Sequence, residues 1–187
     1  MIPGNLARRY ARALLELADT PAKRDRFDKD IEALGAAFDL PDELGSPLGR
    51  VLEAGRFPLA ARKGVAQSIC KRVGADPMVV KFIDYVVEQG RTSGISQMAM
   101  HYRDLADQQA NRVRATVTSA QKLAPDAINK IKAALENSTG KTVVIETAVD
   151  PELIGGVMTQ VGSYRLDRSV KHQLETLRAN LKAGAAS

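Results

Sequence analysis

The sequence has little of the chemistry on which disulfides, metal sites and most active sites depend. Among its 187 residues are one cysteine, two histidines and no tryptophan. Because a single cysteine cannot form an internal disulfide, Cys70 fits a reducing compartment, and its place in a helical pattern indicates a small apolar side chain of the interior. Neither His101 nor His172 has a partner at the spacing of metal ligands. We therefore expect no metal, no cofactor and no catalysis.

Long apolar runs are also missing. No stretch approaches the ~18 apolar residues that a membrane-spanning helix needs. The first five residues lack the apolar segment of a signal peptide and lead directly into a helical pattern. We expect the chain to lie outside the bilayer and to begin with its mature domain.

The charge is moderate and scattered. The net charge is +5, and residues 111–187 contribute +4 of it, with eleven Lys and Arg against seven Asp and Glu. A nucleic-acid-binding surface requires cations gathered on one face, which the sequence does not show. A basic helical nucleic-acid-binding module remains the alternative function, and it would show salt-sensitive affinity.

Apolar residues recur at helical spacing throughout residues 1–108. The clearest stripe is formed by Phe27, Ile31, Leu34 and Phe38, at intervals of four, three and four. Asn5 is placed to cap the first helix, and proline and glycine punctuate the chain at short intervals. The pattern predicts a six-helix bundle. Its expected helices begin at about residues 5, 22, 44, 60, 76 and 92.

The helix expected over residues 76–89 differs from the others. Asp76 and Pro77 form its start, and Gly90 ends it. Valine, isoleucine and aromatic residues surround much of its circumference between these ends. A helix that is apolar on most sides is buried on more than one of them. It is either the centre of the bundle or a helix with one face left for a partner.

From Asn111 the apolar period changes from helical to alternating. Residues 113–117 predict a strand, and Pro125 opens a helix with Ile128, Ile131 and Leu135 on its inner face. Further strands are expected over residues 141–149 and 155–165, and a final helix, capped by Ser169, over residues 169–181. The chain is therefore predicted to be α+β overall, with a helical domain over residues 1–108 and a small α+β domain over 109–187.

Two possible sites of chemistry are rejected at this stage. Gly140-Lys141-Thr142 resembles the end of a phosphate-binding loop, but it follows a helix and precedes a strand, the reverse of the required order. Three carboxylates, Asp28, Asp30 and Glu32, are expected on the polar face of a helix, paired with neighbouring cations.

Several short motifs, in order along the whole chain, resemble one family. They are Tyr10-Ala11-Arg12-Ala13 in the first helix, Gly90-Arg91, Val117-Thr118-Ser119-Ala120, Ile154-Gly155-Gly156, and Asp167-Arg168-Ser169-Val170. Together they are similar to the delta subunit of F-type ATP synthases, whose mitochondrial counterpart is the oligomycin-sensitivity-conferring protein. Arg168 departs from the pattern, because the family often has glycine there, which puts a glycine-only backbone conformation at this turn in doubt.

The resemblance implies a stator subunit for proton-driven ATP synthesis. In the family, the helical domain receives the N-terminal helix of an alpha subunit, and the C-terminal domain holds the b subunits of the peripheral stalk, which resists rotary torque. The subunit catalyses nothing and binds no nucleic acid. The resemblance and the absence of a transit segment imply a bacterial peripheral membrane protein at the cytoplasmic face of the inner membrane.

The resemblance also implies where the alpha-subunit helix would dock, because the family forms this groove from its first and fifth helices. We expect a mixed set of core and groove residues there, which the sequence does not divide. The set is Leu6, Tyr10, Leu14, Ile83, Tyr85 and Val86. The stripe formed by Val170, Leu174, Leu177 and Leu181 is compatible with a b-subunit contact, but its pattern favours a core helix.

Overall fold

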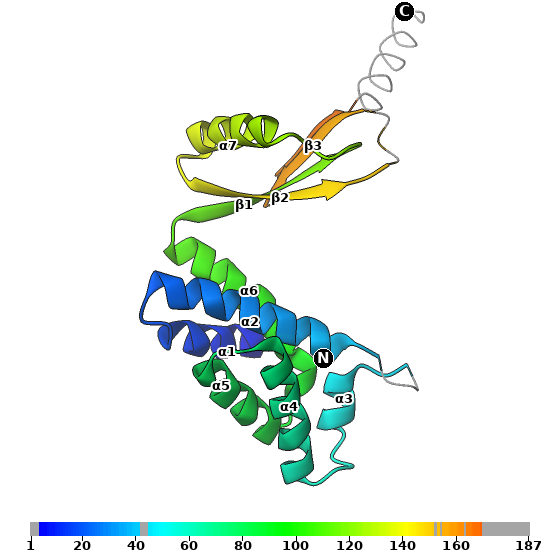
Figure 1. Cartoon of the computed structure of the whole chain (residues 1–187). Coiled ribbons are helices and arrows are strands. Elements are labelled where there is room, and N and C mark those ends of the chain that lie inside the picture. Colours follow the sequence, from blue (N-terminus) through cyan, green and yellow to red (C-terminus); the bar gives the residue numbers. More distant parts are fainter. Residues whose placement is uncertain (1–3, 42–44, 152, 154, 163, 170–187) are drawn as a thin grey trace, which may run out of the picture. The chain divides into compact units, whose positions relative to one another are not determined.

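The computed structural model describes residues 4–41, 45–151, 153, 155–162 and 164–169 (Figure 1). The chain has a mixed α+β structure with two compact units, Met1–Ala110 and Asn111–Ser187. Asn111 has a φ of 49°, in the left-handed region that asparagine tolerates better than most residues. It separates the last helix of the first unit from the first strand of the second. No helix in the described ranges is long and apolar enough to cross a membrane.

The first unit consists of helices joined by short connections. They are α1 (Gly4–Glu16), α2 (Pro21–Asp39), α3 (Leu48–Glu53), α4 (Leu59–Val73), α5 (Pro77–Glu88), the short 3-10 helix η1 (Thr92–Gly94) and α6 (Ile95–Gln109). Local chemistry sets several of their ends. The Asp76 carboxylate accepts a hydrogen bond from Met78 N at 2.9 Å and so caps α5, as predicted. Gly74 ends α4 with a φ of 71°, which residues with a Cβ rarely adopt.

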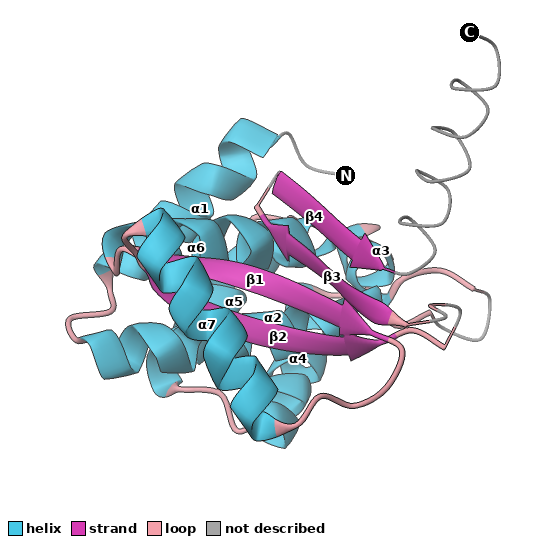
Figure 2. Cartoon of the chain, turned by 90° about the horizontal axis from the view of Figure 1, so that it is seen from above, coloured by secondary structure: helices cyan, strands magenta, loops and turns pink. Residues whose placement is uncertain are grey.

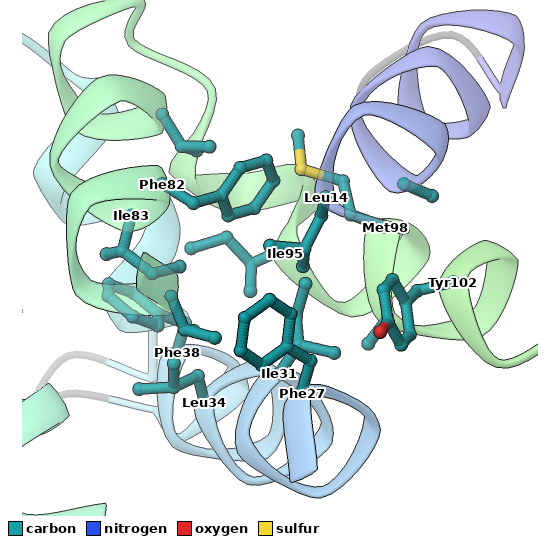
Figure 3. Packing of buried hydrophobic residues seen from close by; sticks show 14 of the residues in the cluster. Leu14, Phe27, Ile31, Leu34, Phe38, Phe82, Ile83, Ile95, Met98 and Tyr102 are labelled. Atoms are coloured by element: carbon teal, nitrogen blue, oxygen red, sulfur yellow. The ribbon is translucent and has the colours of Figure 1, made fainter. Parts of the chain in front are cut away.

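The core of this unit lies between α2, α6, α1 and α5 (Figure 3). The predicted stripe of α2, from Phe27 to Phe38, is at most 1 % exposed at each of its four positions. From α6, Ile95, Met98 and Tyr102 enter the same cluster and are fully buried. These side chains point toward one another from separate helices, so the stripe read from the sequence of α2 is the face that this helix buries.

Two helix starts differ from the prediction. Asn5 lies within α1, which begins at Gly4, so it is not the cap. The third helix begins at Leu48 rather than near residue 44. Pro47 has no N–H and pairs with Pro41 in an isolated bridge, while Leu48 N donates to the Leu40 carbonyl at 3.0 Å. This small closure holds residues 45–47 outside the helix.

Of the three α2 carboxylates predicted to lie on the polar face, only Glu32 is exposed. Asp28 and Asp30 are 6 % and 8 % exposed. Asp30 Oδ2 accepts a hydrogen bond from Asp76 N at 2.8 Å, and Asp28 lies 3.5 Å from the guanidinium of Arg103. Both carboxylates face neighbouring helices, so they connect α2 to α5 and α6 instead of lying in water.

Gly49 gives a direct test of the packing between α3 and η1. A Cβ at this position would lie 2.9 Å from the Thr92 carbonyl oxygen, whereas a Cβ at Gly64 in α4 would meet nothing within 4 Å. Gly49→Ala should therefore destabilise the protein by about 1–3 kcal/mol. Gly64→Ala should stabilise it by about 0.5–1 kcal/mol through lower backbone entropy of the unfolded chain. Urea denaturation followed by circular dichroism measures both, and equal signs would contradict the packing described here.

The second unit contains a four-stranded sheet and one described helix (Figure 2). Its elements are β1 (Arg112–Ser119), α7 (Pro125–Thr139), β2 (Thr142–Val149), β3 (Gly156–Val161) and β4 (Tyr164–Ser169). The strand order is β2-β1-β3-β4. β1 and β2 are parallel, with α7 as their crossover connection, and the other two pairings are antiparallel.

The strand predicted over residues 155–165 is wrong, because the chain reverses inside it. Gly162 has a φ of 57°, and the segment forms the hairpin of β3 and β4, with Val161 opposite Tyr164. Arg168 lies in β4 opposite Val157, and a strand position of this kind does not require glycine. Ser169 is the last residue of β4, and the helix predicted beyond it lies outside the described residues.

The helix α7 packs against the parallel strands less deeply than predicted. Ile128, Ile131 and Leu135 are half-buried, and no described residue of α7 is fully buried. The Glu136 side chain accepts a hydrogen bond from Val143 N at 3.0 Å and so joins α7 to β2. Gly140, with a φ of 66°, ends the helix immediately before β2, as predicted, which is the opposite of a phosphate-binding loop.

Candidate partner-binding groove

A groove of about 550 Å³ runs between α1 and α5. Three large apolar side chains are exposed along it, Leu17 at 42 %, Met78 at 38 % and Tyr85 at 51 %. The complete lining is Leu6, Arg9, Tyr10, Ala13, Leu17, Met78, Lys81, Phe82, Tyr85 and Arg91. Apolar groups exposed together in a concave surface, rather than singly, are typical of a binding site.

The sequence of α1 explains why this helix contributes to both the core and the groove. Ala7, Ala11 and Leu14, followed by Ala18 just beyond the helix, are 0–3 % exposed and form the core stripe. A second stripe at the same spacing lies one residue earlier, at Leu6, Tyr10, Ala13 and Leu17, and it lines the groove. Successive residues of a helix point about 100° apart, so the two stripes cover adjacent faces. The side chains of the second stripe are mostly larger, and the rest of the protein does not bury them completely.

The apolar circumference of α5 divides in a similar way. Val79, Ile83, Val86 and Val87 are each 0 % exposed and belong to the core. Met78, Lys81, Phe82 and Tyr85 of the same helix line the groove. Both readings of this helix therefore hold, since most of it is core and one face is left open.

Three aromatic rings join the two helices along the groove. Tyr10 packs edge-to-face on Phe82, with ring centroids 6.2 Å apart and planes at 71°. Its ring also lies 6.2 Å from that of Tyr85, at a tilt of 40°. Such pairs contribute about 0.5–1.5 kcal/mol each beyond their buried area. These contacts fix α1 and α5 relative to each other, so the groove is already formed in the absence of a partner.

The six residues expected around the groove fall into two groups. Leu6, Tyr10 and Tyr85 line it. The other three, Leu14, Ile83 and Val86, are fully buried in the core, where no partner can reach them. They are the core members of the expected mixed set, and a partner-binding role remains a proposal for the groove members alone. In sequence they share the helical period of the groove residues, and only packing distinguishes the two faces.

The groove lining also includes residues that sequence reasoning did not select. Leu17 and Ala13 continue the stripe of Leu6 and Tyr10, and this period could have identified them. The cations Arg9, Lys81 and Arg91 had no such signal, because nothing in their spacing indicates that α1, α5 and the segment after α5 meet.

The described ranges show neither a reactive thiol nor a cluster of metal ligands. Burial raises the pKa of the Cys70 thiol to about 11, with the charge of Asp84 acting in the same direction, so the reactive thiolate is suppressed at neutral pH. The described residues contain no group of three or more His, Cys, Asp or Glu side chains that could hold a metal ion.

Comparison with known proteins gives a consistent result along nearly the whole chain. The family model described as ATP synthase delta (OSCP) subunit matches residues 6–181. The ATP synthase subunit delta of Syntrophobacter fumaroxidans is 34 % identical over 184 residues, which are 96 % of this chain and 96 % of that protein. That of Myxococcus xanthus is also 34 % identical over 184 residues, with 97 % of this chain and 99 % of the relative covered.

A solved structure shares the fold. A chain of the mitochondrial ATP synthase hexamer of Toxoplasma gondii, determined by electron cryo-microscopy, superimposes with a TM-score of 0.59. The match covers 94 % of this chain and 97 % of that one, at 19 % sequence identity. At this identity the likeness supports the arrangement of helices and strands, and no more.

Proposed function

Because the chain belongs to the ATP synthase delta (OSCP) subunit family, a component of the peripheral stalk of F-type ATP synthases, we propose that the groove between α1 and α5 receives the N-terminal helix of an alpha subunit. The subunit then links the catalytic head to the stalk and resists the torque of the rotor.

The observation that carries this proposal is the open apolar face shared by α1 and α5. The 13 residues of α1 are about 20 Å long at 1.5 Å per residue, which matches three to four turns of a docked helix. An amphipathic helix in an apolar groove is a common mode of peptide recognition. Leu17, Met78 and Tyr85 give such a helix apolar side chains to cover.

We further propose a division of labour between the two parts of the chain. The helices of residues 1–108 act together as a six-helix bundle that binds the head, and residues 109–187 bind the b subunits. Neither part catalyses a reaction. We place the protein at the cytoplasmic face of the bacterial inner membrane, attached through the complex rather than through the bilayer. The family membership supports each of these roles.

Calorimetric titration of the full chain with a synthetic peptide of the cognate alpha subunit's N-terminal helix tests the docking proposal. We expect one-to-one binding with a negative heat-capacity change, because apolar surface is buried. Leu17→Ser should weaken binding about tenfold or more, since a buried leucine contributes roughly 1.5–3 kcal/mol.

Met100→Ser is the matched control. Met100 is 68 % exposed on α6 and does not line the groove. Its substitution removes the same kind of exposed apolar side chain and should leave the affinity unchanged. Absence of binding by the folded wild-type chain, or equal effects of the two substitutions, would refute docking in this groove.

A further inference from the structure

The walls of the groove carry positive charge without negative charge. Arg9 of α1, Lys81 of α5 and Arg91 line it, and no carboxylate does. Within the described part of the chain, none of these three cations forms an ion pair or a side-chain hydrogen bond. The Nε atom of Arg91 is buried and has no hydrogen-bond partner there. Arg91 therefore adds to the unpaired positive charge beside the groove.

The carboxylates of α5 are directed away from the groove. Asp84 accepts hydrogen bonds from Gln67 of α4 at 3.0 and 3.2 Å, and Glu88 pairs with Lys63 of the same helix. Glu16 of α1 lines a different depression, beside Arg12. The acids of the helices that form the groove are therefore held elsewhere, and its cations are left for a partner.

We infer that the occupant of the groove is an acidic amphipathic helix, in which carboxylates flank the apolar stripe on both sides and face Arg9 on one wall and Lys81 on the other. This inference rests on the proposed function, because it specifies the chemistry of the helix that docks there. It assigns to Arg9 and Lys81 the role of selecting the partner, in addition to the apolar contacts.

The physical reason is that a docked helix takes water away from the wall cations. A helix flanked by carboxylates replaces the lost hydration with charge-assisted hydrogen bonds. A neutral helix would leave the wall cations unpaired, and a basic helix would be repelled by them. Both should therefore bind more weakly than an acidic helix. Since the ends of the Arg9 and Lys81 side chains are reached by solvent ions, the effect should also weaken as salt is added.

Charge reversal tests the inference in the full chain, with the alpha-subunit peptide as the probe. Arg9→Glu should weaken binding about tenfold, whereas Arg8→Glu, the neighbouring exposed arginine outside the groove, should change it less than twofold. Lys81→Glu and the exposed Lys71→Glu on α4 form a second pair with the same expected contrast. The two substitutions of a pair change the net charge equally, and Arg8 and Arg9 also share one helix, so the main difference within each pair is the position relative to the groove.

The peptide supplies the reciprocal measurement. Replacing each of its Asp and Glu residues by Gln should weaken binding to the wild-type chain and remove most of the salt dependence. For the Arg9→Glu chain we expect no such loss. The glutamine-substituted peptide should bind this variant at least as tightly as the original acidic peptide does. Equal affinity of both peptides for the wild type, or equal effects of Arg9→Glu and Arg8→Glu, would overturn the inference and leave the proposed docking intact.

A second probe keeps the two proposals separate. Two designed helical peptides share one apolar stripe, and glutamates flank the stripe in one and lysines in the other. Tighter binding of the glutamate peptide supports the inference even where the alpha-subunit peptide fails to bind, a failure that would refute only the proposed function. Tighter binding of the lysine peptide, or displacement of the glutamate peptide by a duplex DNA oligonucleotide, would refute an acidic helix as the occupant.

Discussion

Val86→Asp should unfold the first unit, whereas Tyr85→Asp, one residue earlier, should leave it folded. Val86 is 0 % exposed in the core, and Tyr85 is 51 % exposed in the groove. A carboxylate at position 86 would lose its hydration without gaining a partner, at a cost of several kcal/mol. Since a domain of this size is stable by about 5–15 kcal/mol, that cost removes most or all of its stability. At position 85 the carboxylate stays in water.

Circular dichroism and urea denaturation of the full chain measure this difference. Tyr85→Asp should lower the free energy of unfolding by less than about 2 kcal/mol, because the edge of the aromatic cluster is lost but no charge is buried. Val86→Ala removes side-chain volume without introducing a charge. The small cavity that it leaves should lower the free energy of unfolding by only about 1–3 kcal/mol. Similar stability of the two aspartate variants would mean that position 86 is open to solvent, which would contradict the division of α5 into core and groove.

This division shows where sequence reasoning about the site stops. The periodicity of residues 6–17 contains two apolar stripes one residue apart, and the sequence alone does not say which one is covered. Alanine dominates the buried stripe and larger side chains the open one, the reverse of the expectation that the largest residues go inside. Close approach of α1 to α6 accounts for this choice, because small side chains permit it.

The fold was more accessible than the site because most of its elements have strong local signals. The stripe of α2, the Asp76 cap of α5 and the glycines that end α4, α5 and α7 are all visible in the sequence. Alternation up to Gly162 predicts one continuous strand, and it carries no signal for the reversal of the chain that forms the hairpin of β3 and β4. The hydrogen bond from Asp76 N to the Asp30 carboxylate joins residues far apart in the chain. Such contacts do not appear in the periodicity of the sequence, so the burial of these carboxylates is not predictable from it.

Alkaline pH should expose a further property of the core, because Tyr102 is fully buried there. Its hydroxyl donates a hydrogen bond to the Arg24 carbonyl at 3.2 Å. Burial raises the pKa of Tyr102 above the usual value of 10.0, and the nearby charge of Asp28 acts in the same direction. The folded state therefore keeps this proton where the unfolded state has lost it. The stabilisation is complete below pH 10 and is lost as the pH rises above that value, by up to about 1.4 kcal/mol per pH unit for one proton.

Tyr102→Phe should make this alkaline loss of stability shallower. At pH 7 the variant should lose about 1 kcal/mol, since the Arg24 carbonyl loses its donor. Urea denaturation between pH 8 and pH 11 is best measured in a Cys70→Ala background, because the thiol, with its pKa raised to about 11, adds a loss of the same sign that begins near pH 9. Tyr164→Phe is the control, as this ring is 83 % exposed and gains little from folding. A parallel decline in Tyr102→Phe and its parent would show that the phenol titrates alike in both states, and so that Tyr102 is not held in the core as described.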